Sequence, residues 1–254
     1  MDIYKHSCSY QTVIRIPESP FSVENNRRWR LDTASVAGSA VFSALALVLG
    51  GASQAVGLNF PLIPYLQFDV GEVAIILAFF IFGPAPALVS SLVEFGGLMA
   101  FGQQVPVGPI LKLFALVSTV AGMWVGAKVA SRRGETSLFG LAGWSTVVGA
   151  AARAAVMTLP NFYLIVYLYG TTAIEGFVRA PFSLVGVGLT DANTLWVVLG
   201  FTAVFNVLQL ALVMAVSSFV LRVPAVPRIK VGGRAPWFAA VMREGKRVDV
   251  EPLR

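Results

Sequence analysis

Residues Thr194 to Leu221, TLWVVLGFTAVFNVLQLALVMAVSSFVL, contain no charged side chain, and Arg222 follows them directly. A helix needs roughly 20 mostly apolar residues to cross the hydrocarbon core of a bilayer. This stretch exceeds that length, so it predicts a transmembrane helix. The amide side chains near its middle, Asn206 and Gln209, are three residues apart and therefore share one face of the predicted helix.

The rest of the chain has the composition of an integral membrane protein. Of its 254 residues, 56% are hydrophobic and 13% are charged, whereas a typical soluble domain has roughly 25% charged residues. The charges gather at the N-terminus, between Lys128 and Glu135, and from Arg222 onward. The apolar stretches between these clusters predict six spans: Ala34–Val56, Gly71–Phe82, Pro84–Phe101, Pro109–Ala130, Leu138–Tyr169 and Thr194–Leu221.

Two of these spans are irregular. Gly71–Phe82 is short for a full crossing of the bilayer. Three arrangements would explain such a short span: a tilted neighbouring helix, a locally thinned bilayer, or an outer end that is buried in protein. It follows Leu58–Val70, whose prolines Pro61 and Pro64 predict an ordered but non-helical loop. The fifth span is interrupted by Pro160.

The positions of lysine and arginine predict the orientation of the spans, because cytoplasmic loops carry an excess of these residues. One side of the predicted bundle has Arg27, Arg28, Arg30, Lys128, Arg132, Arg133, Arg222, Arg228 and Lys230, and the other has Asp69, Glu72, Glu175, Arg179 and Asp191. We therefore expect an all-α, multi-pass plasma-membrane protein: a six-transmembrane-helix bundle with both termini in the cytoplasm.

The predicted organisation has three parts. Residues 1–33 form a cytoplasmic N-terminal tail without the apolar run of a secretory signal, and residues 34–222 form the membrane domain. Residues 223–254 form a basic cytoplasmic tail, which we expect to be mostly disordered near anionic lipid. The alternative for this tail is a docking segment for a cytoplasmic partner.

Several function classes are disfavoured by what the chain lacks. With one histidine, His6, and one cysteine, Cys8, it has neither the ligands of a typical zinc site nor an intramolecular disulfide. It contains no G-x-x-x-x-G-K-[ST] loop and no G-x-S-x-G motif. Its basic residues flank apolar spans, so they do not indicate nucleic acid. We expect no enzyme activity, no cofactor and no bound metal.

Polar side chains within the spans are the candidate functional residues, because each costs free energy unless it faces protein or water. Glu94, Arg153, Asn161, Asn206 and Gln209 all fall between the predicted midplane and the outer surface, which predicts a polar cavity that opens outward. The alternatives are structural: Glu94 and Arg153 as a buried ion pair, and the amides as interhelical hydrogen bonds. Lys112 lies near the outer end of the fourth span, so we expect its side chain to snorkel toward the membrane surface.

Small residues predict where helices approach closely. Ala40 and Ala44 lie four residues apart on a small-residue face of the first span. Gly122 and Gly126 have the same spacing on the fourth span, where we expect ordinary internal packing.

Several of these stretches resemble a known family. The first stretch is Pro61–Glu72, followed by Phe82-Gly83-Pro84. The second is Met157–Tyr163 with Tyr167-x-Tyr169-Gly170, and the third is Phe205-Asn206-Val-Leu-Gln209. Together they resemble the substrate-binding S components of energy-coupling factor (ECF) vitamin transporters. The riboflavin-specific group is the most similar. Ala40-x-x-x-Ala44 resembles the alanine motif with which S components dock on the transmembrane coupling subunit. The resemblance extends over about Ala34 to Leu221.

The resemblance implies a subunit that captures a vitamin from outside and works with a coupling subunit and two cytoplasmic ABC-type ATPases. It implies that Asn161, Asn206 and Gln209 contact the ligand. The resemblance implies riboflavin or a related flat heterocycle as the substrate. Gln209 stands where the riboflavin group has a lysine, and Glu94 lies where that group tends to carry lysine; the loss of positive charge at these two positions favours a relative of riboflavin.

Aromatic residues such as Phe68 and Tyr163 could stack on such a ring. Glu94 and Arg153 complete the predicted site. Two other functions stay open: a stand-alone proton-coupled secondary carrier, and a membrane scaffold whose polar residues only stabilise the bundle.

Overall fold

The structure of the protein, a computed structural model, describes residues 32–102, 104–190, 192–228 and 230–248. Five helices in this part are long and apolar enough to cross a membrane. They are α2 (Thr33–Val56), α4 (Pro84–Phe101), α5 (Val107–Arg132), α6 (Leu138–Tyr163) with its π-helical extension η1 (Leu164–Tyr169), and α8 (Thr194–Leu221). The prediction of an all-α membrane protein is therefore confirmed at this level, whereas six spans and their orientation stay predictions.

The remaining elements are short. Strands β1 (Asn59–Phe60) and β2 (Ile63–Gln67) form an antiparallel hairpin after α2, and α3 (Glu72–Phe82) follows it. Helix α7 (Thr171–Leu184) comes after η1, and η2 (Val226–Arg228) and α9 (Trp237–Val248) follow α8. The predicted N-terminal tail, residues 1–33, lies almost wholly outside the described residues.

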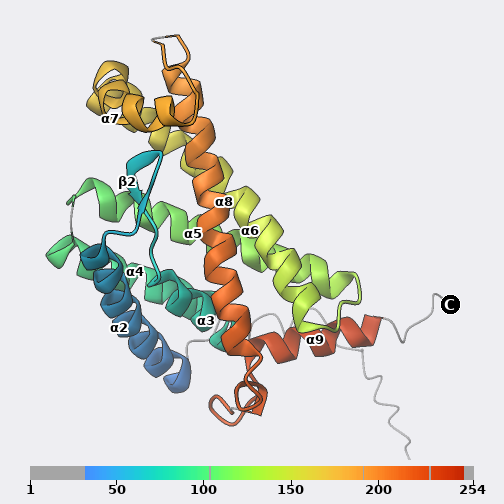
Figure 1. Ribbon diagram of the computed structural model, residues 1–254. Helices are drawn as coiled ribbons and strands as arrows, with labels where there is room; N and C mark the ends of the chain where they lie inside the picture. Colours follow the sequence, from blue (N-terminus) through green and yellow to red (C-terminus); the bar gives the residue numbers. More distant parts are fainter. Residues whose placement is uncertain (1–31, 103, 191, 229, 249–254) are drawn as a thin grey trace, which may run out of the picture. The chain divides into compact units, whose positions relative to one another are not determined.

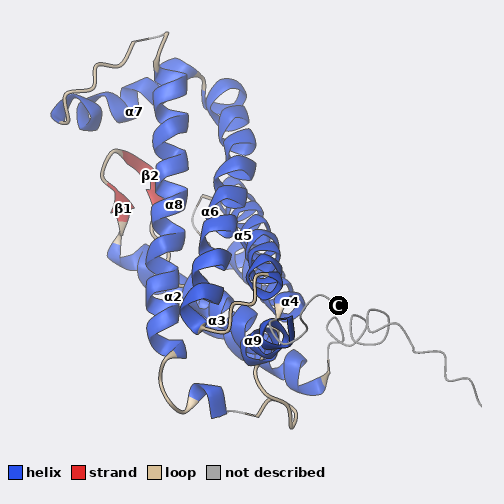
Figure 2. Cartoon of the chain, turned by 90° about the vertical axis from the view of Figure 1, so that its right-hand side faces the viewer, coloured by secondary structure: helices blue, strands red, loops and turns tan. Residues whose placement is uncertain are grey.

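The helices have two distinct ends, which we name after the short helices beside them. At the α9 end, α9 packs against α3, α5 and α6, and Asp32 at the start of α2 pairs with Arg234 at 3.9 Å. At the α7 end, α7 packs against η1, β2 and the start of α8. Figure 1 shows α9 crossing one end of the bundle and α7 the other, and Figure 2 shows the hairpin near α7.

Helix α3 corresponds to the predicted short second span, and it is enclosed by protein. Its residues from Glu72 to Phe80 are all buried, because α2, α4 and α8 surround it and α9 packs against it near its C-terminal end. Its 11 residues extend over ~17 Å. The hairpin precedes this helix, and Phe68, directly after β2, packs on Phe205 of α8 at 5.0 Å between ring centroids. Of the three explanations for the short span, an end buried in protein matches this arrangement, since non-helical backbone at membrane depth needs protein around it.

Helices α5 and α6 pack through glycine, as expected. A Cβ atom at Gly122 would lie 2.8 Å from the Cα atom of Gly149, and one at Gly126 would lie 2.4 Å from the carbonyl oxygen of Trp144. Larger side chains would push the two helices apart. The internal-packing interpretation of these glycines is confirmed.

The C-terminal tail contains a helix where we expected mostly disorder. In α9, Phe238 and Val241 are 1% and 4% exposed, and both belong to the apolar core that α3, α5, α6 and α8 form. The Trp237 ring meets Phe79 of α3 at 4.9 Å between centroids. The last residues, 249–254, lie outside the described part of the chain.

Candidate ligand-binding cavity

A cavity of about 540 Å³ lies in the half of the bundle nearer α7. Its lining comes from the hairpin, the C-terminal ends of α2 and α4, the starts of α3 and α5, the C-terminal half of α6 with η1, the middle of α8, and α7. Most of this lining is apolar, with Phe68, Leu111, Leu164 and Phe177 among it. The charged and amide side chains at the cavity wall are Asp69, Glu72, Lys112, Arg153, Asn161, Asn206, Gln54, Gln67 and Gln104.

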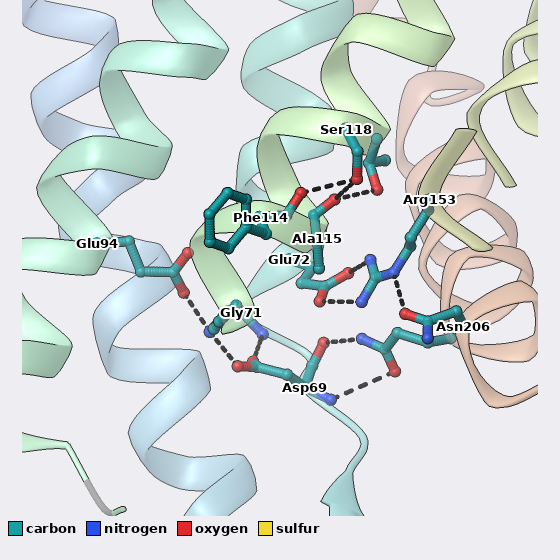
Figure 3. A network of polar contacts seen from close by, with 12 residues as sticks. Asp69, Gly71, Glu72, Glu94, Phe114, Ala115, Ser118, Arg153 and Asn206 are labelled. Carbon is teal, nitrogen blue, oxygen red and sulfur yellow. Dashed lines mark hydrogen bonds and ion pairs between the residues drawn. The ribbon is translucent and has the colours of Figure 1, made fainter. Parts of the chain in front are cut away.

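The inner wall of the cavity contains a buried ion pair between α3 and α6. The Arg153 guanidinium donates two hydrogen bonds to the Glu72 carboxylate, from Nη1 to Oε2 at 2.6 Å and from Nη2 to Oε1 at 2.9 Å. Its Nε donates to Oδ1 of Asn206 at 2.9 Å, and Asn206 Nδ2 donates to the Thr202 carbonyl. Figure 3 shows the three side chains converging from α3, α6 and α8. Because Arg153 is only 3% exposed, this fork-to-fork geometry compensates much of its desolvation.

A second charged group joins the loop before α3 to α4 and α5. Lys112 Nζ donates to Oδ2 of Asp69 and, at 2.6 Å, to Oε1 of Glu94. Glu94 is fully buried, and its other oxygen, Oε2, has no hydrogen-bond partner among the described residues. Asp69 Oδ1 accepts the Gly71 backbone N–H at 2.6 Å. Position 71 requires glycine, since a Cβ there would lie 2.5 Å from the Ala46 carbonyl oxygen.

Two amides hold backbone near the cavity. Gln209 Nε2 donates to the Asp69 carbonyl at 2.8 Å, and its Oε1 accepts the Asp69 N–H at 3.4 Å. Gln209 therefore holds the segment between β2 and α3 without lining the cavity itself. Asn161 Nδ2 donates to the Met157 carbonyl at 2.7 Å. Since that carbonyl can only accept, Oδ1 of Asn161 is the free atom, and it has no partner in the described part of the chain.

The hairpin contributes a tyrosine to the cavity lining. Burial raises the pKa of Tyr65 to about 12. Like any tyrosine hydroxyl at neutral pH, its hydroxyl carries a proton and can donate a hydrogen bond.

The predicted site residues fall into three groups. Arg153, Asn161, Asn206 and Phe68 line the cavity. Glu94 and Gln209 lie behind its wall, in contact with Lys112 and Asp69 respectively. Tyr163 is 62% exposed, does not line the cavity and packs against Tyr167.

Two sequence interpretations are wrong. Glu94 and Arg153 do not pair with each other: Glu94 pairs with Lys112, and Arg153 pairs with Glu72. Lys112 does not snorkel, because its side chain is 14% exposed and contacts two carboxylates.

The residues of the candidate site that sequence reasoning missed are Asp69, Glu72 and Lys112. Asp69 precedes the short apolar helix and Glu72 begins it, so the sequence pattern assigns both to the outer surface. The signal that could have found them is charge balance, since buried Arg153 and Glu94 each require an opposite charge.

The described residues contain no group of three or more histidine, cysteine, aspartate or glutamate side chains that could hold a metal ion. Comparison of the chain with protein-family models, curated proteins and solved structures finds no match.

Proposed function

We propose that this protein is the substrate-capturing membrane subunit of an ECF-type ABC importer, in which it binds a vitamin, riboflavin or a related heterocycle, for ATP-driven uptake. The observation that carries the proposal is the cavity of about 540 Å³, lined by the hairpin at the α7 end and by buried polar side chains near the middle of the bundle. Its volume falls within the range of small-molecule sites, roughly 300–1,000 Å³.

The position of the cavity suits a capturing subunit. Its described lining includes the C-terminal end of α2, the α4–α5 loop and α7, and none of the α9 residues whose side chains the structure describes. Its lining is mostly apolar and also contains the Glu72–Arg153–Asn206 group. In the orientation that the lysine and arginine pattern predicts, the α7 end of the bundle faces outward.

The exterior face of α2 supports the proposed docking role of Ala40 and Ala44. Both residues are exposed, whereas the side of α2 that packs against the bundle carries Ser35, Ser39 and Ser43. Ala40 and Ala44 are therefore accessible to a partner helix, and their small side chains allow close approach of its backbone.

The test is uptake of the compound that is released from the purified protein, with riboflavin assayed first. We expect accumulation in cells that also contain the coupling subunit and two active ATPases. Loss of accumulation with catalytically inactive ATPases would support the proposal. Equal uptake with inactive ATPases would contradict it.

A second candidate function is a proton-coupled secondary carrier. It is favoured by Glu94, a buried carboxylate with one oxygen on Lys112 and the other without a partner in the described chain. Intramembrane carboxylates of this kind can relay protons. Uptake into proteoliposomes that contain this chain alone, driven by a proton gradient, would favour the carrier over the importer subunit.

A further inference from the structure

The charges around the cavity do not balance. Among the described residues, Asp69 and Glu94 pair with Lys112 and Glu72 pairs with Arg153, and the rest of the described cavity lining is uncharged. With all five groups ionised, the cluster carries one net negative charge. In a buried setting an uncompensated charge is costly, so the cluster favours an additional positive charge.

The buried hydrogen-bonding atoms near the cavity that lack a partner in the described chain include two acceptors, Oδ1 of Asn161 and Oε2 of the ionised Glu94. The third is the hydroxyl of Tyr65 in the lining, which can accept as well as donate. Asn161 lines the cavity directly, and Glu94 contacts the lining through Lys112. A ligand that lacks a donor would leave Asn161 Oδ1 unpaired, which costs binding free energy.

On the basis of the proposed function, we propose that the cavity binds a small organic cation whose charged nitrogen donates hydrogen bonds and whose apolar ring fills the remaining volume. Asn161 Oδ1 accepts a hydrogen bond from this ligand, and the Asp69–Lys112–Glu94 group supplies the negative potential. Phe68, Leu111 and Phe177 enclose the apolar part.

Two simpler sources of positive charge fit less well. A proton on Glu94 neutralises the cluster but leaves Asn161 Oδ1 without a donor. A sodium or potassium ion requires several oxygen ligands and would occupy a small fraction of about 540 Å³, with the apolar lining left uncovered.

The experiment compares two probes of matched shape, tryptamine and tryptophol, which share a ring and differ in an ammonium against a hydroxyl group. Their dissociation constants are measured by thermal shift on the purified full-length protein at pH 7, up to about 10 mM, which detects millimolar affinity. We expect tryptamine to bind at least roughly tenfold more tightly than tryptophol, because a hydrogen bond to a charged group contributes more than a neutral one.

Variants locate the source of this preference. Glu94→Gln and Asp69→Asn each remove one negative charge from the cluster and should reduce the preference for tryptamine to about twofold or less. Glu135→Gln makes the same chemical change in the α5–α6 turn, away from the cavity, and should keep the full preference. Asp69→Asn gives an independent test if Glu94→Gln does not fold.

Three results would overturn the inference: equal binding of the two probes, no binding of tryptamine, or full preference in both charge variants. A thermal shift specific to sodium or potassium, compared with choline at equal ionic strength, would assign the charge to an inorganic ion and overturn it too. The outcome is separable from the proposed function. Cation preference without ATP-driven uptake removes only the importer role, whereas ATP-driven uptake of a neutral compound removes only this inference.

Discussion

At the scale of single residues, the buried charges of this protein form two groups with different geometry. Arg153 and Glu72 face each other with two parallel hydrogen bonds, and Asn206 accepts the remaining Nε–H. Lys112 instead holds two carboxylates that come from different segments, Asp69 and Glu94. The first group therefore joins helices α3, α6 and α8, and the second fixes the loop that leads into α3.

The Glu72–Arg153 pair predicts a non-additive effect on stability. Arg153→Met leaves the Glu72 carboxylate buried and unpaired, which should destabilise the protein by about 3–5 kcal/mol. The double variant Glu72→Gln, Arg153→Met should be more stable than Arg153→Met alone. Thermal unfolding in detergent measures both. Equal unfolding temperatures for Arg153→Met and the double variant would mean that the pair contributes no coupling.

The residue scale is also where sequence reasoning was least complete. The depth of Arg153, Asn161 and Asn206 along apolar stretches placed these residues at one cavity, because rise per residue converts position into depth. Their partners could not be found in this way. Glu72 begins a short helix whose start is buried, so hydropathy alone assigned it to the outer surface.

At the scale of helices, the bundle depends on close contacts of unequal kinds. Helices α5 and α6 touch through Gly122, Gly126 and Gly149. Helix α2 instead turns its serines inward and leaves Ala40 and Ala44 exposed. Glycine spacing predicted the first contact, since a Cβ-free surface has few other uses within a bundle. The helix in the C-terminal tail was missed because prolines and glycines surround its short apolar patch.

The α5–α6 contact predicts that size at position 122 is critical. Gly122→Leu should lower the free energy of unfolding by about 1–3 kcal/mol, because its side chain would overlap Gly149 and Ala152. Gly143→Leu on α6 makes the same change where nothing lies within 4 Å of a Cβ atom, and it should be nearly neutral. Equal destabilisation by both changes in thermal unfolding would argue against this contact.

The exposed face of α2 predicts a separation of binding from assembly. Ala44→Leu should weaken co-purification of the proposed coupling subunit and leave ligand affinity unchanged, since Ala44 does not line the cavity. Ala52→Leu, also exposed on α2, is the control and should do neither. Loss of ligand binding with intact assembly would assign Ala44 to internal packing.

At the scale of the whole molecule, the arrangement of charge predicts the orientation in the membrane. Lys128 and Arg133 stack on Trp124 and Trp144, and Arg222 on Phe139, in the half of the bundle that α9 covers. Cation and aromatic side chains together are typical of a membrane interface. The cavity lies toward the opposite end, so orientation decides from which side a ligand enters.

Cysteine labelling tests this orientation. In a Cys8→Ser background, single cysteines at Thr136 and Ala225 should be protected from a membrane-impermeant thiol reagent in intact cells. A cysteine at Gly176 in α7, where nothing lies within 4 Å of a Cβ atom, should react. Labelling of Thr136→Cys from outside would reverse the orientation.

Capture of a small molecule in the cavity near α7 is tested by mass spectrometry of compounds released from the purified, denatured protein. We expect one compound to be enriched with the wild-type protein and with Asn59→Leu, an exposed hairpin position. Asn161→Leu removes the free acceptor and should weaken binding by about tenfold to a hundredfold, with a matching loss of that compound. Identical compounds at identical levels from Asn161→Leu and wild type, or none from either, would mean that this cavity does not capture the compound.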